Sequence, residues 1–67
     1  MDVRRKYQFE LCECLGPERK FNLVIPSGIW SVDESHSPVR VFLGYRVKEV
    51  DKAAFEQLKS ARKAIPV

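Results

Sequence analysis

The only histidine of the chain stands in a segment that contains the side-chain types of a serine–histidine–aspartate relay. This segment, DESHS, spans residues 33–37, with His36 between two serines. In a relay the imidazole must touch the nucleophile and the orienting carboxylate together, which neighbours in one short loop do not ordinarily achieve. No glycine-rich elbow or oxyanion nest accompanies the segment. We therefore expect a solvated loop here, no catalytic site, and a chain that is not an enzyme.

The two cysteines, Cys12 and Cys14, form a lone Cys-Glu-Cys unit. A closed zinc site needs paired cysteine units or downstream histidines, which the sequence does not contain. In a strand both thiols would lie on one face, too far apart for relaxed disulfide geometry. We expect two reduced thiols on a half-buried face, and neither a metal nor a cofactor.

Basic residues recur in RVFLGYRVK, residues 40–48. Read as one strand, the period-two alternation places Arg40, Arg46 and Lys48 on one face with Phe42. Cations hold phosphates and aromatic rings stack bases, so this face could contact a polyanion. The alternative is a solvent-exposed face that binds no ligand and whose positive charge is offset by Glu10 on a neighbouring strand. The predicted contact surface comprises Arg4, Arg5, Trp30, Arg40, Phe42, Arg46 and Lys48.

The alternation of apolar and polar residues predicts the elements that position these side chains. One strand is expected from Tyr7 to Cys14, a hairpin connection at residues 15–19, and a second strand that Pro26 interrupts. Residues 29–32 either resume that strand or form another. A third strand is expected at residues 39–50, and the spacing of apolar residues after it predicts a helix over 51–64, with Asp51 as N-cap.

These elements predict an α+β fold: an antiparallel meander of three to four strands with one C-terminal helix packed on one face. The whole chain, residues 1–67, is expected to form a single small domain. The face under the helix is expected to comprise Phe9, Leu11, Phe21, Leu23, Val41 and Leu43. The uncovered face is expected to comprise Cys12, Cys14, Val24 and Phe42 among the cations, with Trp30 joining them.

The composition limits what such a domain can do. The chain has 67 residues with a formal net charge of +3, and 45% of them are hydrophobic, which argues against wholesale disorder. A domain of this size buries only about 60% of the surface that its unfolded chain exposes, so its core is thin and a second subunit would help it. The first eleven residues contain charges without a continuous apolar stretch, so we expect no signal peptide, no membrane span and a cytoplasmic location.

We therefore expect a small interaction module that forms a homodimer and binds another protein through a sheet face or edge, bearing Cys12, Phe42 and Trp30. The alternative function is nucleic-acid binding by the basic strand face, and a cryptic enzyme is the third. No small-molecule substrate is expected.

Overall fold

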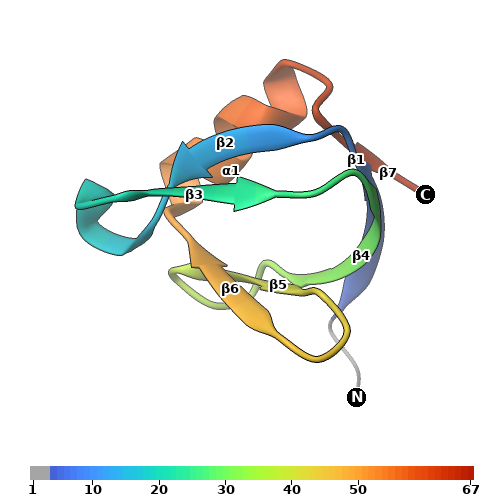
Figure 1. Ribbon diagram of the computed structural model, residues 1–67, viewed down its shortest axis with the longest axis horizontal. Helices are drawn as coiled ribbons and strands as arrows, with labels where there is room; N and C mark the ends of the chain where they lie inside the picture. Colours follow the sequence, from blue (N-terminus) through green and yellow to red (C-terminus); the bar gives the residue numbers. More distant parts are fainter. Residues whose placement is uncertain (1–3) are drawn as a thin grey trace.

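The computed structural model describes residues 4–67 and contains two antiparallel sheets and one α-helix (Figure 1). The elements are β1 (Arg5–Phe9), β2 (Cys12–Leu15), the short 3-10 helix η1 (Pro17–Arg19), β3 (Asn22–Ile25), β4 (Gly28–Asp33), β5 (Val39–Phe42), β6 (Val47–Val50), α1 (Lys52–Ser60) and β7 (Ala64–Pro66). Five strands form one sheet in the order β6-β5-β4-β1-β7, and β2 pairs with β3 in the second sheet. The expected α+β class with antiparallel strands is confirmed, whereas the expected count of three to four strands is wrong.

The segment expected as one strand from Tyr7 to Cys14 divides between the two sheets at residues 10–11. β1 pairs with β4 and β7, whereas β2 pairs with β3. The break leaves Phe9 only 2% exposed but Leu11 66% exposed. Leu11 is therefore outside the core, contrary to expectation, because a period-two pattern keeps its faces only while the strand continues.

The segment between β3 and β4 crosses from the small sheet to the large one. Residues 26–27 separate the two strands, so residues 29–32 belong to a strand of their own, paired with β1 and β5. Gly28, at the start of β4, has a φ of 150°, and a Cβ there would lie 2.8 Å from the ring of Trp30. The absent side chain lets the indole lie against the backbone, where its Nε1 donates to the Pro26 carbonyl at 2.8 Å.

Residues 39–50, expected as one strand, form a β-hairpin. β5 ends at Phe42 and β6 begins at Val47, and the chain reverses through Gly44, whose φ of 73° favours glycine. The N–H of Leu43 donates to the carbonyl of Arg46 at 2.7 Å. Because directly opposed residues share a face, the odd-numbered residues of β6 lie on the face of the even-numbered residues of β5.

The start of α1 agrees with expectation. The Asp51 side chain accepts a hydrogen bond of 3.3 Å from the N–H of Ala54, as an N-cap residue does. Val50, before the cap, and Phe55, in the first turns, are both fully buried. Burial of this pair agrees with the hydrophobic staple that fixes how a chain enters a helix.

The end of α1 differs from expectation, because the helix stops at Ser60 and not at residue 64. Arg62 has a φ of 59°, which ends the helical conformation. The N–H groups of Arg62 and Lys63 donate to the carbonyls of Lys59 and Leu58, at 3.1 and 2.8 Å. This pair of bonds is a Schellman closure, and it directs the chain into β7 at the edge of the large sheet.

One hydrophobic cluster lies between the large sheet and the layer formed by α1 with β2 and β3. Its buried members are Tyr7, Phe9, Cys14, Ile25, Val32, Val39, Val41, Val50, Ala54, Phe55, Leu58 and Ala64. Of the six residues expected under the helix, Phe9 and Val41 are buried and Leu23 and Leu43 are partly buried, but Leu11 and Phe21 are exposed. Within residues 4–67 no helix has the length and apolar character needed to cross a membrane.

Candidate interaction surfaces

The structure separates the three cations that alternation had grouped. Arg40 lies on β5, Arg46 in the turn and Lys48 on β6. The register opposes Arg40 to Glu49 and Lys48 to Val41, which is fully buried. Arg40 therefore lies on the outer face of the large sheet and Lys48 on its core side. The expectation of one face with all three cations is wrong, because the hairpin inverts the faces after its turn.

A smaller group of cations does surround Phe42 on the outer face. The Cζ of Arg4 lies 4.9 Å from the centroid of the Phe42 ring, within cation–π distance. Arg40 shares this face, and Lys6 stands in the same cross-strand row as Phe42, through β4. Arg5 does not join them, since it lies opposite Val32 on the core side of β1.

The carboxylates near Arg40 are not the one expected. Glu10 forms an ion pair with Lys63 at 3.1 Å. Arg40 instead has Asp33 and Glu49 as its cross-strand neighbours on β4 and β6. Neighbouring strands thus place negative charge on both sides of Arg40, which reduces the electrostatic strain that a run of cations would cause.

The His36 loop is organised around Asp33. The hydroxyl and the N–H of Ser35 both donate to Asp33 Oδ1, at 2.5 and 3.0 Å, and His36 Nε2 lies 3.7 Å from Asp33 Oδ2. The Ser35 hydroxyl bond lowers the pKa of Asp33 against the effect of burial, and the charges of His36 and Arg40 lower it further. Ser35 contacts the carboxylate directly, which is the geometry of a side-chain-stabilised turn.

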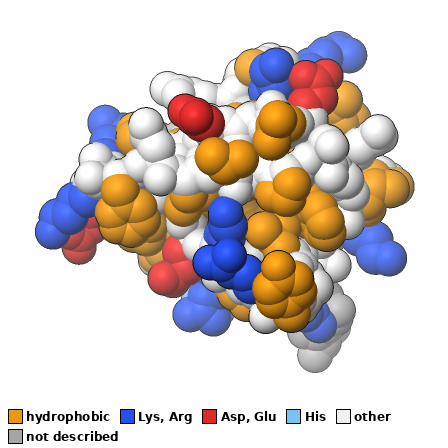
Figure 2. Space-filling model, in the orientation of Figure 1, with side chains coloured by type: hydrophobic (Ala, Val, Ile, Leu, Met, Phe, Trp, Pro, Cys, Tyr) orange, Lys and Arg blue, Asp and Glu red, His pale blue; other side chains and the backbone are white. Residues whose placement is uncertain are grey.

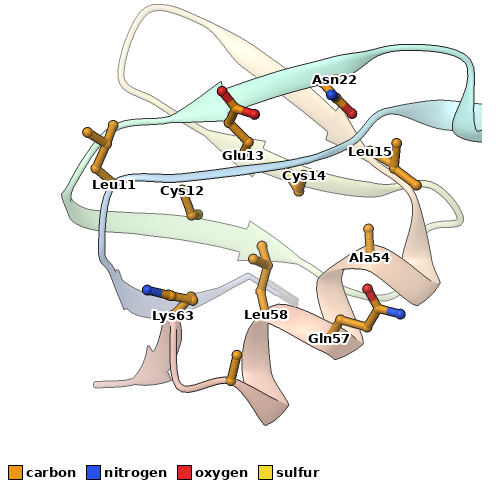
Figure 3. Close-up of a pocket in the computed structure, with 11 residues that line it drawn as sticks. Leu11, Cys12, Glu13, Cys14, Leu15, Asn22, Ala54, Gln57, Leu58 and Lys63 are labelled. Carbon is orange, nitrogen blue, oxygen red and sulfur yellow. The ribbon is translucent and has the colours of Figure 1, made fainter.

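Trp30 and the cysteines do not share the Phe42 face. Trp30 lies opposite Tyr7 in the register and packs half-buried against the core. Cys12 and Cys14 are free thiols that point from β2 toward α1 (Figure 3). Burial is the main cause that raises the pKa of Cys14 to about 11. The expected surface with Cys12, Phe42 and Trp30 together therefore does not form.

The two thiols line a groove of about 590 Å³ between β2 and α1, into which Leu58 also points (Figure 3). Backbone hydrogen bonds of 3.0 Å stand at both ends of this groove. At one end the Asp51 N–H donates to the Leu15 carbonyl, and at the other the Glu10 N–H donates to the Lys63 carbonyl. The groove is thus bounded at each end by the protein's own chain.

A polar network that the sequence did not predict joins β1, α1 and the loop after β4. The hydroxyl of Tyr7 donates to Glu34, and Lys59 Nζ lies 2.8 Å from Glu34 Oε1 and 3.3 Å from a Glu56 oxygen. Burial opposes ionisation of Glu34, but the bonds from Lys59 and Tyr7 outweigh it and lower its pKa. Burial and Glu34 together raise the pKa of Tyr7, and the bond to Glu34 raises the pKa of Lys59.

β3 and β6 face each other across an open seam between the two sheets. Each is the edge strand of its own sheet. Lys48 Nζ donates across the seam to the Val24 carbonyl at 2.6 Å. A hollow of about 260 Å³ lies here, lined by Pro17, Phe21, Leu23, Arg46, Lys48 and Glu49.

The segments that border this seam, β3 with the residue before it and β6 with the turn before it, carry exposed hydrophobic side chains. They are Phe21, Val24, Tyr45 and Val47, with exposed fractions of 58, 43, 93 and 52%, and we call them the seam cluster. Figure 2 shows hydrophobic side chains gathered over β3 and the β5–β6 hairpin, with Lys and Arg side chains between them. Exposed apolar groups bordered by polar ones are typical of interaction sites.

Comparisons with protein-family models, with curated proteins and with solved structures found no match. The geometry of this chain offers two surfaces, the seam with its exposed hydrophobic side chains and the cationic group around Phe42.

Proposed function

We propose that the protein is a small, non-catalytic, cytoplasmic interaction module that self-associates and binds another protein through the open edges at the β3–β6 seam. The seam cluster is the observation that supports this function. Tyr45 in particular, at 93% exposed, gives a large aromatic side chain to solvent at the tip of a hairpin. Aromatic residues of this kind are enriched at interfaces because they bury much area at little entropic cost.

Sedimentation velocity over a micromolar concentration series tests self-association. We expect a dimer in the parent protein and a monomer in the double variant Phe21→Ser, Tyr45→Ser. The matched control is Leu11→Ser, Ile65→Ser, which also removes two exposed hydrophobic side chains, 66 and 44% exposed, but outside the seam cluster. A parent protein that stays monomeric at all concentrations, or a control that dissociates equally, would contradict this part of the proposal.

A second candidate function, binding of a polyanion such as single-stranded nucleic acid, is supported by the group around Phe42. Arg4 and Arg40 bring positive charge to a half-buried aromatic ring on an exposed sheet face. The test is a fluorescence titration with a labelled oligonucleotide at about 50 and 200 mM salt, because phosphate contacts weaken steeply over this range. We expect salt-dependent binding that Arg40→Gln with Phe42→Ala removes; equal binding by the variant would reject this function.

A further inference from the structure

We propose that the β3–β6 seam accepts an extended peptide strand of another protein, one face of which carries both apolar and acidic side chains. The inference rests on the proposed function, since it specifies how the interaction module would hold its partner. Such strand addition uses main-chain hydrogen bonds for affinity and alternate side chains for specificity.

The backbone of β3 offers hydrogen-bonding groups to the seam. The N–H of Gly16 donates to the Phe21 carbonyl at 2.8 Å, so this pair is a hydrogen-bonded pair of the β2–β3 ladder. In an antiparallel ladder such pairs alternate with pairs whose N–H and C=O groups point outward. Asn22 and Val24 belong to the outward pairs. The Lys48 bond to the Val24 carbonyl agrees with this alternation.

The backbone of β6 faces the seam in the same way. The Leu43 N–H bond to the Arg46 carbonyl fixes the hydrogen-bonded pairs of the β5–β6 ladder. By the same alternation, the N–H and C=O groups of Val47 and Glu49 point away from β5. Both residues are exposed, as are the outward residues of β3. The seam thus presents two accessible strand edges, and such edges are templates for pairing with another chain.

Lys48 already makes one of the contacts that an inserted strand would make. Paired strands lie about 4.8 Å apart and bond through their backbones. Across this seam, the donor to the Val24 carbonyl is a side-chain ammonium at the end of a long lysine stem. Its position is that of an incoming backbone N–H. A strand inserted here would displace Lys48 and pair with β3 and β6 together, joining the two sheets into one.

The side chains around the seam define the chemistry of the occupant. Phe21 and Leu23 line the hollow with apolar surface, which suits apolar side chains on one face of the inserted strand. Arg46 and Lys48 line it with two positive charges against the single carboxylate of Glu49. Displaced from its carbonyl, Lys48 would have its ammonium beside the new strand. Because Arg46 and Lys48 line the same hollow as Phe21 and Leu23, acidic residues on the same face of the inserted strand as its apolar residues would supply the opposite charges.

The edge of β2 that does not pair with β3 is a weaker candidate. Its groove is bounded at one end by the bond between Asp51 and Leu15, and at the other by the bond between Glu10 and Lys63. Between these bonds, alternation leaves the outward groups of Glu13 facing the groove. A single residue on one strand offers fewer hydrogen bonds than the two facing edges of the seam.

The test begins with selection from a random heptapeptide display library on the immobilised full chain. We expect enrichment of sequences in which apolar and acidic residues occupy every second position, so that they share one face of an extended strand. One enriched peptide is then synthesised, labelled and titrated against the parent protein and against Val24→Pro, which removes an N–H that faces the seam. We expect Val24→Pro to weaken binding at least tenfold.

The matched control is Glu13→Pro, at the cross-strand partner of Val24. Its N–H also lies outside the β2–β3 ladder but faces away from the seam, so proline is tolerated there for the same reason. We expect this variant to bind the peptide like the parent protein. A second measurement leaves the protein unchanged: the same peptide, N-methylated at alternate residues, should also bind at least tenfold more weakly.

Three results would overturn the strand proposal. The first is a library that yields no enriched sequence. The second is a peptide that binds equally well after N-methylation and to Val24→Pro; if Phe21→Ser with Tyr45→Ser still abolishes its binding, the interaction function stands and only the strand mode fails. The third is loss of the dimer in Val24→Pro without any enriched peptide, which would assign the seam to a second copy of this chain.

Discussion

Lys48 Nζ donates a hydrogen bond of 2.6 Å to the carbonyl oxygen of Val24, and this bond joins β6 of the large sheet to β3 of the small one. Lys48 lies on the core side of its strand, opposite the buried Val41, and its ammonium reaches the seam. The bond thus closes the side of the fold opposite to the backbone pairing of β1 with β7.

We expect Lys48→Met to lower the free energy of unfolding by about 1 kcal/mol, the usual net value of one hydrogen bond, because methionine retains the apolar stem but not the donor. Urea denaturation followed by tryptophan fluorescence measures this. Arg46→Met is the control, in the exposed turn next to β6, and should change the free energy by less than about 0.5 kcal/mol. Equal losses in both variants would show that the carbonyl contact contributes nothing specific.

The seam could not be predicted from the alternation of apolar and polar residues, although one residue indicates the turn that precedes β6. Gly44 interrupts the run of alternating residues 39–50, and a glycine inside a strand pattern signals a bend or turn. With the turn placed there, Lys48 moves to the core side and the cations separate. The register between two strands depends on turn geometry, however, and the exposure of Phe21 depends on the path of a different hairpin. Neither is encoded in local periodicity.

Leu58 and Leu11 provide a direct comparison between a core leucine and one that only alternation would place in the core. Leu58 is 7% exposed within the hydrophobic cluster, and Leu11 is 66% exposed. We expect Leu58→Ala to lower the free energy of unfolding by about 2 to 5 kcal/mol, through lost burial and the cavity left behind. Leu11→Ala should change it by less than about 0.5 kcal/mol. Thermal melts of the two variants side by side decide the matter, and similar shifts would place Leu11 in the core after all.

The Tyr7–Glu34–Lys59 network predicts a dependence of stability on pH. The pKa of Glu34 is lowered in the folded state from its ordinary value of 4.5, so its contribution is present above that value and is lost as the pH falls through the folded pKa. We expect the free energy of unfolding of the parent protein to exceed that of Glu34→Gln at pH 6, and this difference to shrink below pH 4.5. Denaturation curves at both ends of this range test it. If this difference did not vary with pH, the ionisation of Glu34 would not be its cause.

In alkaline solution the contribution of the same network to stability depends on pH in the opposite direction. The pKa values of Tyr7 and Lys59 are raised from 10.0 and 10.5, so their contributions are present below those values and are lost as the pH rises further. The polar composition of the loop after β4 predicts that Glu34 is solvated. Its contact with Lys59, 25 residues later, depends on how α1 packs on β1.

The cationic group around Phe42 was predicted in part. Arg40 and Phe42 lie two residues apart on one strand, and local alternation suffices to place them on one face. Arg4 reaches the same ring from the position just before β1, a strand that is separated from β5 by β4. The expected companions Arg5 and Trp30 lie on the other face, because the phase of β1 and β4 relative to β5 is set by pairing between strands.

Arg62 ends α1 in a conformation that an arginine adopts at a cost. Its φ of 59° is in the left-handed region, where the contact between Cβ and the backbone costs roughly 1 kcal/mol. Glycine, which has no Cβ, is therefore the preferred residue at this position of a Schellman closure. Because this position holds an arginine, no glycine marks the end of the helix in the sequence. The spacing of apolar residues alone therefore predicts a helix that continues to residue 64. The bonds from Arg62 and Lys63 to the last turn hold the strained conformation in place.

We therefore expect Arg62→Gly to raise the free energy of unfolding by about 0.5 to 1 kcal/mol, since relief of the left-handed strain exceeds the added entropy of a glycine in the unfolded chain. Arg62→Ala is the control, because it removes the same side chain but keeps the Cβ, and it should remain within about 0.5 kcal/mol of the parent protein. Urea denaturation of the three proteins measures both differences. If alanine stabilised as much as glycine, the gain would come from removing a positive charge, and the backbone argument for the position of the helix end would fail.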